Sequence, residues 1–169
     1  MSFLDLDDWL LELAEVAENV YSPVASDCKV YPVDVDACLV EGAVANSDNL
    51  ELARAVRACT RLVVSFGDCA ISANVPGLRN LITAGGRDSA MAALQRSYLE
   101  LADAQPQIPD APGVVPELLP RVLPLHEVIP VDVYLPGCPP SAARIRACLE
   151  PLLRGEKPRL EGAELLRFG

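Results

Sequence analysis

The segment Leu62-Val63-Val64-Ser65-Phe66-Gly67 decides the fold prediction. It is short, rich in β-favouring residues and stopped by glycine, which is typical of a buried parallel strand. Working outward, apolar runs at 37–40 and 131–135 predict two further strands. Residues 47–58 and 139–154 have the pattern of helices, the first capped by Ser47. Strands that alternate with helices predict an α/β fold with a parallel sheet and right-handed crossovers.

Four other segments complete the predicted organisation. Residues 2–19 predict a helix with an apolar stripe, and no strand precedes it, which is unusual for an α/β chain. Residues 88–104 predict another helix, whereas 68–86, with Pro76 and several glycines, predict a loop. Residues 105–130 are rich in proline. They predict either a long surface connection with a short helix near 117–119 or a segment that docks a partner.

The charge excludes some classes of partner. The formal net charge is −10, and nucleic-acid binding needs clustered Lys and Arg instead. An anionic membrane surface is disfavoured for the same reason. The acidic start predicts no signal peptide, and no apolar run approaches the roughly 20 residues of a membrane span. We therefore expect a cytoplasmic protein, in which its six cysteines are not structural disulfides.

The six cysteines fall into two groups. Four lie in or beside predicted strands and helices, and we interpret them as small buried hydrophobic residues. These four are Cys28, Cys38, Cys59 and Cys148. Cys69 and Cys138 each lie just past the carboxyl end of a predicted strand, in Gly67-Asp68-Cys69 and Gly137-Cys138. Open α/β sheets bind ligands at this end of their strands. From position alone, two hypotheses stay open: two thiolates that share one metal centre, or ordinary loop cysteines.

A set of short motifs occurs in order along the chain. They are Met1-Ser2-Phe3-Leu4-Asp5, Leu39-Val40-Glu41-Gly42-Ala43-Val44, Gly67-Asp68-Cys69-Ala70, Asn74-Val75-Pro76, Leu78-Arg79-Asn80, Pro124-Leu125-His126-Glu127-Val128 and Leu135-Pro136-Gly137-Cys138-Pro139-Pro140-Ser141. In these motifs the chain resembles the small subunit of soluble NAD-linked [NiFe] hydrogenases. That family is related to the cluster-bearing 20 kDa subunit of NADH:ubiquinone oxidoreductase. The resemblance implies a single flavodoxin-like iron–sulfur domain over 1–169, with a parallel sheet covered by helices on both faces and the proline-rich connection at 105–130.

The resemblance also implies a [4Fe–4S] cluster. Family members hold it with a Cys-x-x-Cys pair, a cysteine in the Gly-Asp-Cys-Ala motif and a cysteine in Gly-Cys-Pro-Pro. Carried over, Cys69 and Cys138 are the third and fourth ligands. The pair precedes the segment matched by Met1–Asp5, so we expect an N-terminally incomplete domain with two further ligands upstream of Met1. Two explanations for the missing pair stay open: a start assigned at an internal Met, or a shortened protein. Cys28 as a substitute ligand is a weaker hypothesis.

The family's activity implies partners. A large subunit carrying the NiFe site splits H₂, and electrons pass through the small subunit's cluster to a flavin/iron–sulfur module that reduces NAD(P)⁺. The predicted helix 2–19 would direct its N-terminal amides toward the cluster. Some relatives also hold FMN, which is a secondary expectation because no glycine-rich phosphate loop occurs here.

Four further residues carry functional hypotheses. Glu41 is either a proton relay or hydrogen-bond partner near the cluster, or a solvated carboxylate at a strand end. His126 is interpreted as a residue that fixes its loop, with a hydrogen bond to sulfur or at an interface as the alternative. Arg79 and Asn80 are interpreted as interface or loop-fixing residues.

Two other functions fit parts of the sequence. A subunit of the respiratory NADH:quinone oxidoreductase would be expected to carry adjacent cysteines, and no Cys-Cys pair occurs in this chain. A scaffold or assembly subunit without a cluster is the third possibility, and the lack of a Cys-x-x-Cys pair is its main support.

Overall fold

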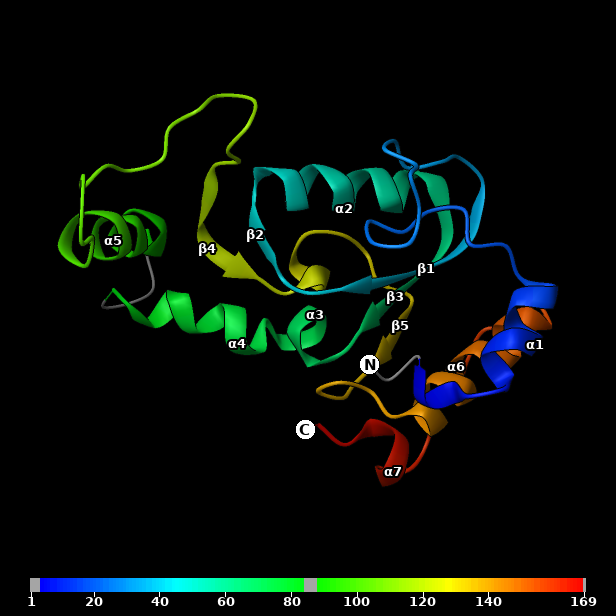
Figure 1. Ribbon diagram of the computed structural model, residues 1–169. Coiled ribbons are helices and arrows are strands. Elements are labelled where there is room, and N and C mark those ends of the chain that lie inside the picture. The colour runs from blue at the N-terminus through cyan, green and yellow to red at the C-terminus, as the bar shows by residue number, and fades with distance from the viewer. Residues whose placement is uncertain (1–3, 84–87, 169) are drawn as a thin grey trace.

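A parallel three-stranded sheet lies at the centre of the computed structural model, which describes residues 4–83 and 88–168. Its strands are β1 (Val35–Glu41), β3 (Thr60–Phe66) and β5 (Val133–Leu135), in the order β1-β3-β5. Both outer strands run parallel to β3 (Figure 1). All three strands predicted from the sequence are therefore present, and the α/β class is confirmed.

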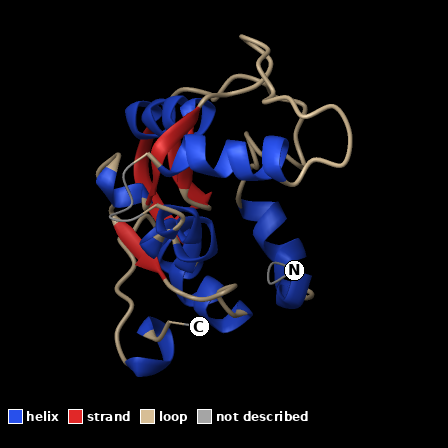
Figure 2. Cartoon of the chain, turned by 90° about the vertical axis from the view of Figure 1, so that its left-hand side faces the viewer, coloured by secondary structure: helices blue, strands red, loops and turns tan. Residues whose placement is uncertain are grey.

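Helices cover both faces of this sheet. On one face lies α2 (Ser47–Cys59), and on the other lie α1 (Trp9–Val16) and α6 (Ala142–Leu153) (Figures 1 and 2). Successive side chains of a strand point to opposite faces. Accordingly, Val63 packs with the α2 side chains and Val64 with those of α6. The predicted arrangement of helices on both faces is confirmed.

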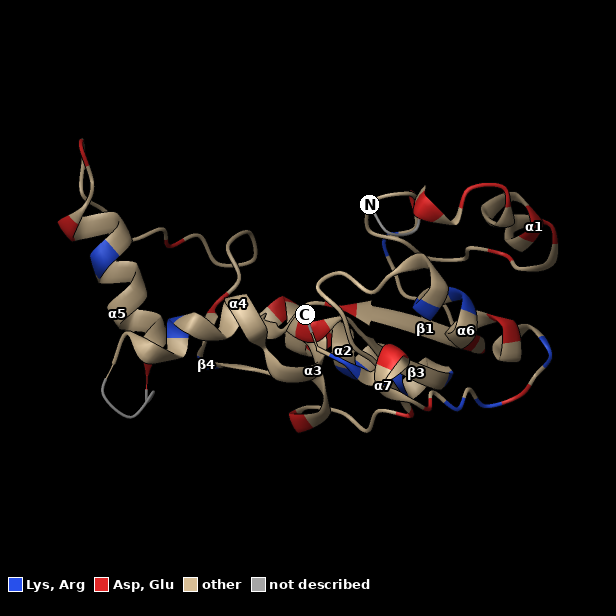
Figure 3. Ribbon diagram, turned by 90° about the horizontal axis from the view of Figure 1, so that it is seen from below, with Lys and Arg blue, Asp and Glu red and all other residues tan. Residues whose placement is uncertain are grey.

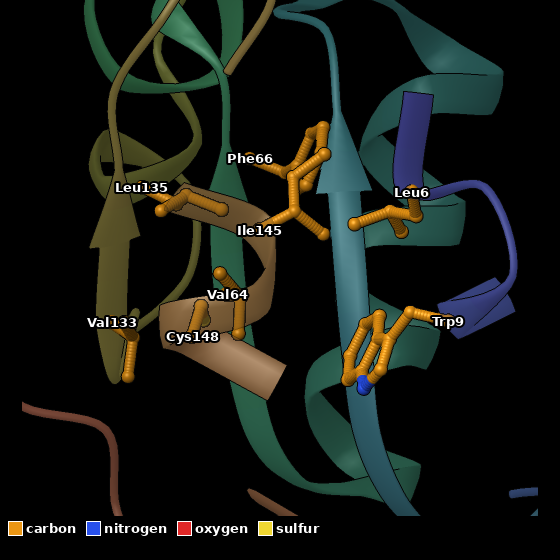
Figure 4. Packing of buried hydrophobic residues seen from close by; sticks show 8 residues of the cluster. All are labelled: Leu6, Trp9, Val64, Phe66, Val133, Leu135, Ile145 and Cys148. Carbon is orange, nitrogen blue, oxygen red and sulfur yellow. The ribbon is translucent and has the colours of Figure 1, made fainter. Parts of the chain in front are cut away.

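The larger core lies between the sheet and the α1–α6 layer. It contains eight buried residues that come from strands and helices far apart in the sequence (Figure 4). These residues are Leu6, Trp9, Val64, Phe66, Val133, Leu135, Ile145 and Cys148. Trp9 also receives the Arg146 guanidinium at 5.3 Å from its ring centroid. This layer anchors α1 to the sheet.

The helix ends follow local capping. Asn46, rather than the predicted Ser47, caps α2: its extended backbone lets Oδ1 accept the Asn49 N–H at 2.8 Å. Ser141 caps α6 by accepting the Arg144 N–H at 3.4 Å. The helix predicted at 88–104 is present as α5 (Ser89–Gln95) and a π turn at Arg96–Glu100.

The predicted helix at 2–19 is shorter and interrupted. A 3-10 turn at Leu4–Leu6 precedes α1, and Asp7 between them has a φ of 49°, which breaks a continuous helix. Ser2 lies outside the described residues, so the prediction that the helix directs its N-terminal amides toward a cluster stays a prediction. From Leu4 to Cys28 the chain carries acidic side chains and no Lys or Arg, so the segment that contains α1 is acidic (Figure 3).

The loop prediction for 68–86 was wrong over 68–81, and 84–86 lie outside the described residues. The segment contains α3 (Asp68–Ser72), α4 (Asn74–Gly77) and a 3-10 turn at Leu78–Leu81. Pro76 does not prevent this, because a proline in the first turn of a helix removes no internal hydrogen bond. These short turns have too few residues to display a helical apolar period.

The short helix predicted near 117–119 was also wrong. Strand β4 (Leu118–Leu123) lies there and pairs antiparallel with β2 (Val44–Asn46). A proline is tolerated in such a two-stranded ribbon, where an N–H can face away from the partner. The elements α4, α5 and β4 form an arm, the α4–β4 arm, that extends away from α1 and α6 (Figures 1 and 3).

A last short helix, α7, occupies Ala163–Leu166. Within 4–83 and 88–168, no helix has the length and apolar character that a membrane crossing requires.

Candidate functional site

Strands β3 and β5 end side by side, and the loops that follow them are bonded to each other. Phe66 and Leu135 are register partners at the last position of the two strands. Beyond them, the Gly67 N–H donates to the Leu135 carbonyl at 2.8 Å, and the Asp68 N–H donates to the Gly137 carbonyl at 2.9 Å. Cys69, at the start of α3, and Cys138, on the loop after β5, therefore lie at one edge of the sheet, as the sequence predicted.

The Asp68 side chain adds a third bond between the loops. Its Oδ1 accepts the Gly137 N–H at 2.7 Å, and the residue is only 5% exposed. A buried charge-assisted bond of this kind is costly to break, because the carboxylate would be left without that donor. This role was not predicted, although the Gly-Asp-Cys motif places a carboxylate at the strand end.

Gly67 and Gly137 allow this close approach. Gly67 has a φ of 82°, and a Cβ there would lie 3.3 Å from the Gly137 carbonyl oxygen. At Gly137, with a φ of 143°, a Cβ would lie 2.4 Å from the Cα of Pro140. Both positions therefore require glycine. The contacts that require glycine here are between the two backbone segments themselves.

The two thiols differ in exposure. Cys69 is half-buried and Cys138 is exposed, and both are free. Asn74, at the start of α4, donates its Nδ2 hydrogen to the Cys138 Sγ at 3.7 Å. A half-buried thiol at the start of α3 and an exposed thiol on the adjoining loop fit two positions of a cluster's ligand set, which for [4Fe–4S] is usually four cysteines. In the part of the chain that the structure describes, no group of three or more His, Cys, Asp or Glu residues is placed to hold a metal ion.

Glu41 lies at the same edge of the sheet. Glu41 is the last residue of β1 and the register partner of Phe66, the residue before Gly67. It therefore lies at the end of the sheet from which the Cys69 segment begins. Its side chain is exposed. Placement at this edge suits both the relay hypothesis and the solvated-carboxylate hypothesis.

The remaining cysteines have different environments. Cys148 is fully buried, and burial raises the pKa of its thiol to about 11. Burial also raises the pKa of the half-buried Cys38, and Cys59 at the end of α2 is likewise half-buried. The interpretation as buried hydrophobic residues is confirmed for Cys148 and was wrong for Cys28, which is exposed and donates to the Val30 carbonyl at 3.0 Å. Cys28 lies in a stretch without regular secondary structure, so no helix or strand of its own places it in the core.

Arg79 and Asn80 fix the α4–β4 arm. Arg79 Nη2 donates to the Leu119 carbonyl at 2.6 Å, and burial lowers the pKa of its guanidinium. Asn80 bonds Val122 twice, accepting its N–H at 2.8 Å and donating to its carbonyl at 2.9 Å. The loop-fixing interpretation is confirmed. His126 is exposed, and its ring lies edge-on to Tyr134 at 6.0 Å between centroids.

An open hollow of about 300 Å³ lies between α4 with the turn that follows it and β4 with the residues just beyond that strand. Its wall includes Asn74, Asn80, Arg121 and Glu127. The hollow therefore adjoins the residue that contacts Cys138, and it is polar.

Known proteins resemble this chain over nearly all of its length. The family described as NADH ubiquinone oxidoreductase, 20 Kd subunit, matches residues 1–152. A subunit of the vhu F420-non-reducing hydrogenase of Methanocaldococcus jannaschii is 34% identical over 161 residues, which cover 95% of this chain and 53% of that protein. NAD-reducing hydrogenase HoxS subunit delta of Cupriavidus necator is 32% identical over 155 residues, covering 92% of this chain and 72% of that protein. The chain thus spans about half the length of the F420-non-reducing relatives.

A solved structure has the same fold. A chain in the crystal structure of an NAD⁺-reducing [NiFe]-hydrogenase in the H₂-reduced state superimposes with a TM-score of 0.87 at 37% identity. The match covers all of this chain and 90% of that one. The flavodoxin-like α/β prediction and the resemblance to hydrogenase small subunits are both confirmed.

Proposed function

The chain belongs to the NADH ubiquinone oxidoreductase 20 kDa subunit family, and from that premise we propose that it is the electron-transferring small subunit of an NAD(P)-linked [NiFe] hydrogenase. One observation carries the proposal: the free thiol of Cys69, at the start of α3, and that of Cys138, on the loop after β5, belong to two segments that three hydrogen bonds join at the carboxyl edge of the sheet. Likeness to subunits named for F420-non-reducing and NAD-reducing hydrogenases supports it.

We propose that Cys69 and Cys138 are two ligands of a [4Fe–4S] cluster. In the family that the sequence resembles, a Cys-x-x-Cys pair supplies the other two thiolates, and we propose the same ligand set for this cluster. When bound, such a cluster takes up and releases one electron at a time. The chain's own residues hold the ligands: Asp68 ties the Gly137 loop to the start of α3, which carries Cys69, and Gly67 and Gly137 let the two backbones meet. The chain itself makes or breaks no substrate bond.

The proposed partners are a large subunit that carries the NiFe site and a flavin/iron–sulfur module that reduces NAD(P)⁺. Exposed apolar side chains next to Asn74 support docking close to the thiols. Val75, Leu78 and Leu81 are 62%, 59% and 77% exposed. Glu41 at the same edge is the proposed proton relay. FMN is a secondary proposal, since the described hollow beside Asn74 is polar but carries no glycine-rich phosphate loop.

Iron and acid-labile sulfide per chain test this function, measured on the complex isolated anaerobically from its native host. The expected result is about four of each attributable to this subunit. Cys69→Ser and Cys138→Ser should each lose iron and H₂-driven NAD⁺ reduction. Cys28→Ser, which changes an exposed thiol elsewhere, should keep both. Normal iron content in either ligand variant would contradict the assignment.

A cluster-free scaffold subunit is the second candidate. The observation in its favour is that the described residues bring together only two thiols at the site and no larger ligand group. Near-zero iron in the wild-type subunit, within an otherwise complete complex, would establish the scaffold function. The respiratory quinone-linked subunit remains a third candidate within the same family, and the lack of a Cys-Cys pair disfavours it.

A further inference from the structure

A polar contact that no sequence pattern predicted lies at the rim of the candidate site. The Asn74 side-chain amide donates to the Cys138 Sγ at 3.7 Å, across 64 positions of sequence. We infer that Asn74 is a positioning residue whose N–H···S hydrogen bond to the Cys138 thiolate raises the reduction potential of the cluster that Cys138 would ligate. This inference rests on the proposed function.

The backbone determines where the Asn74 side chain begins. Ala73 and Asn74 both have positive φ values, 63° and 22°, at the bend between α3 and α4. Ala73 is 4% exposed, and its carbonyl accepts the Gly77 N–H at 2.7 Å. A non-glycine residue in this region costs free energy that the surrounding contacts must offset. The bend is therefore held by packing, and it aims the Asn74 amide at the Cys138 loop.

The bend alone would be a sufficient reason for an asparagine, because this residue tolerates positive φ better than most. In the part of the chain that the structure describes, however, the hydrogen bond of its side-chain amide goes to sulfur on another loop. The two roles make different predictions. If Asn74 serves only to adopt positive φ, glycine at this position preserves its role. If its role is the hydrogen bond to sulfur, glycine abolishes it.

The expected direction follows from charge. Reduction adds one electron, so negative charge on the cluster and its thiolates increases. A hydrogen bond donated to a ligand sulfur stabilises the more negative form and favours reduction. Removing the donor should therefore lower the equilibrium constant for one-electron reduction by roughly threefold to tenfold. At 59 mV per tenfold, this is a shift of about 30–60 mV to more negative potential.

Three variants separate the two roles. Asn74→Gly keeps the positive φ and deletes the amide. Asn74→Asp keeps the shape of the side chain and replaces the N–H donor with an acceptor. Asn49→Asp is the control for one added negative charge: in α2, Asn49 Oδ1 accepts the Ala45 N–H, which aspartate can still do. Each variant is purified anaerobically as the complete complex.

The measurements are iron per complex, the EPR spectrum of the reduced cluster, and its midpoint potential by redox titration. With iron content unchanged, both Asn74 variants should shift to more negative potential, and Asn49→Asp should not. An unshifted potential in both Asn74 variants, or an equal shift in Asn49→Asp, overturns the inference. Loss of iron from both Asn74 variants also overturns it, since Asn74 would then hold the loop rather than tune the cluster. Failure of the proposed function is distinguishable, because the wild-type subunit would then show no cluster signal at all.

Discussion

The parallel sheet and the α4–β4 arm are built in different ways. Between the sheet and its helices, Val64, Leu135 and Ile145 have essentially no exposed surface, and apolar contact holds the elements together. In the arm, side chains of Arg79 and Asn80 tie the 3-10 turn at Leu78–Leu81 to β4, because they bond main-chain carbonyls and an N–H of that strand. Leu78 and Leu81 of the same turn remain exposed.

This difference explains which elements were predicted. Apolar alternation along a strand is a local signal, since the same face is buried at every second residue. A pair of hydrogen bonds between one side chain and a distant main chain, such as those of Asn80 with Val122, produces no periodic pattern in the sequence. The sheet region should therefore be sensitive to loss of volume, and the arm to loss of single hydrogen bonds.

The largest effect is expected from Ile145→Ala in α6. Ile145 is fully buried against the sheet, and truncation removes its contacts and leaves a cavity. The free energy of unfolding should fall by about 2–5 kcal/mol, measured by urea denaturation. Leu11→Ala, at a site 68% exposed in α1, is the matched control and should change stability little. Equal losses in the two variants would contradict the assignment of the core.

A smaller and local effect is expected from Asn80→Ala. The change leaves the Val122 N–H and carbonyl without their partner, at a cost of about 1–3 kcal/mol. Amide hydrogen exchange should accelerate in β4 and stay unchanged in β3. Asn80→Asp keeps the acceptor and should lose only part of the protection. If β3 lost protection to the same extent, the arm and the sheet would be one cooperative unit.

The smallest effect on stability is expected from Asp132, whose carboxylate joins two parts of the sheet region by polar contacts. Asp132, before β5, accepts the Val63 N–H at 2.8 Å and pairs with Arg57 at 2.6 Å. Burial acts to raise the pKa of Asp132, but the Val63 N–H and Arg57 outweigh it and hold the pKa below its ordinary value. The stabilisation is therefore complete above the ordinary pKa of about 3.9 and is lost as pH falls through the lower, folded-state value.

Asp132→Asn should accordingly cost about 1 kcal/mol at pH 7, a modest figure because the pair is partly exposed. The difference between wild type and variant should shrink as the pH is lowered below 4. Urea unfolding at pH 7 and at pH 3 measures both values. A difference independent of pH would show that the carboxylate charge is not what stabilises the contact.

The candidate site was predicted in part. The positions of Cys69 and Cys138 followed from strand ends, because parallel strands bring their carboxyl ends to one edge. The Asp68–Gly137 bond and the Asn74–Cys138 contact did not follow, since they join residues 69 and 64 positions apart. No local pattern of residues encodes which of many polar side chains will meet across such a separation.

The sequence by itself determined the α/β class, the three parallel strands, the helices α2 and α6 and the edge at which the two thiols lie. These depend on β-propensity, apolar periodicity and turn residues, which act between near neighbours. The tertiary structure alone decided the β2–β4 ribbon, the break at Asp7, the buried Asp68 carboxylate and the direction of the Asn74 amide. Each of these depends on a partner brought close only after the sheet has assembled, where burial makes a single hydrogen bond decisive.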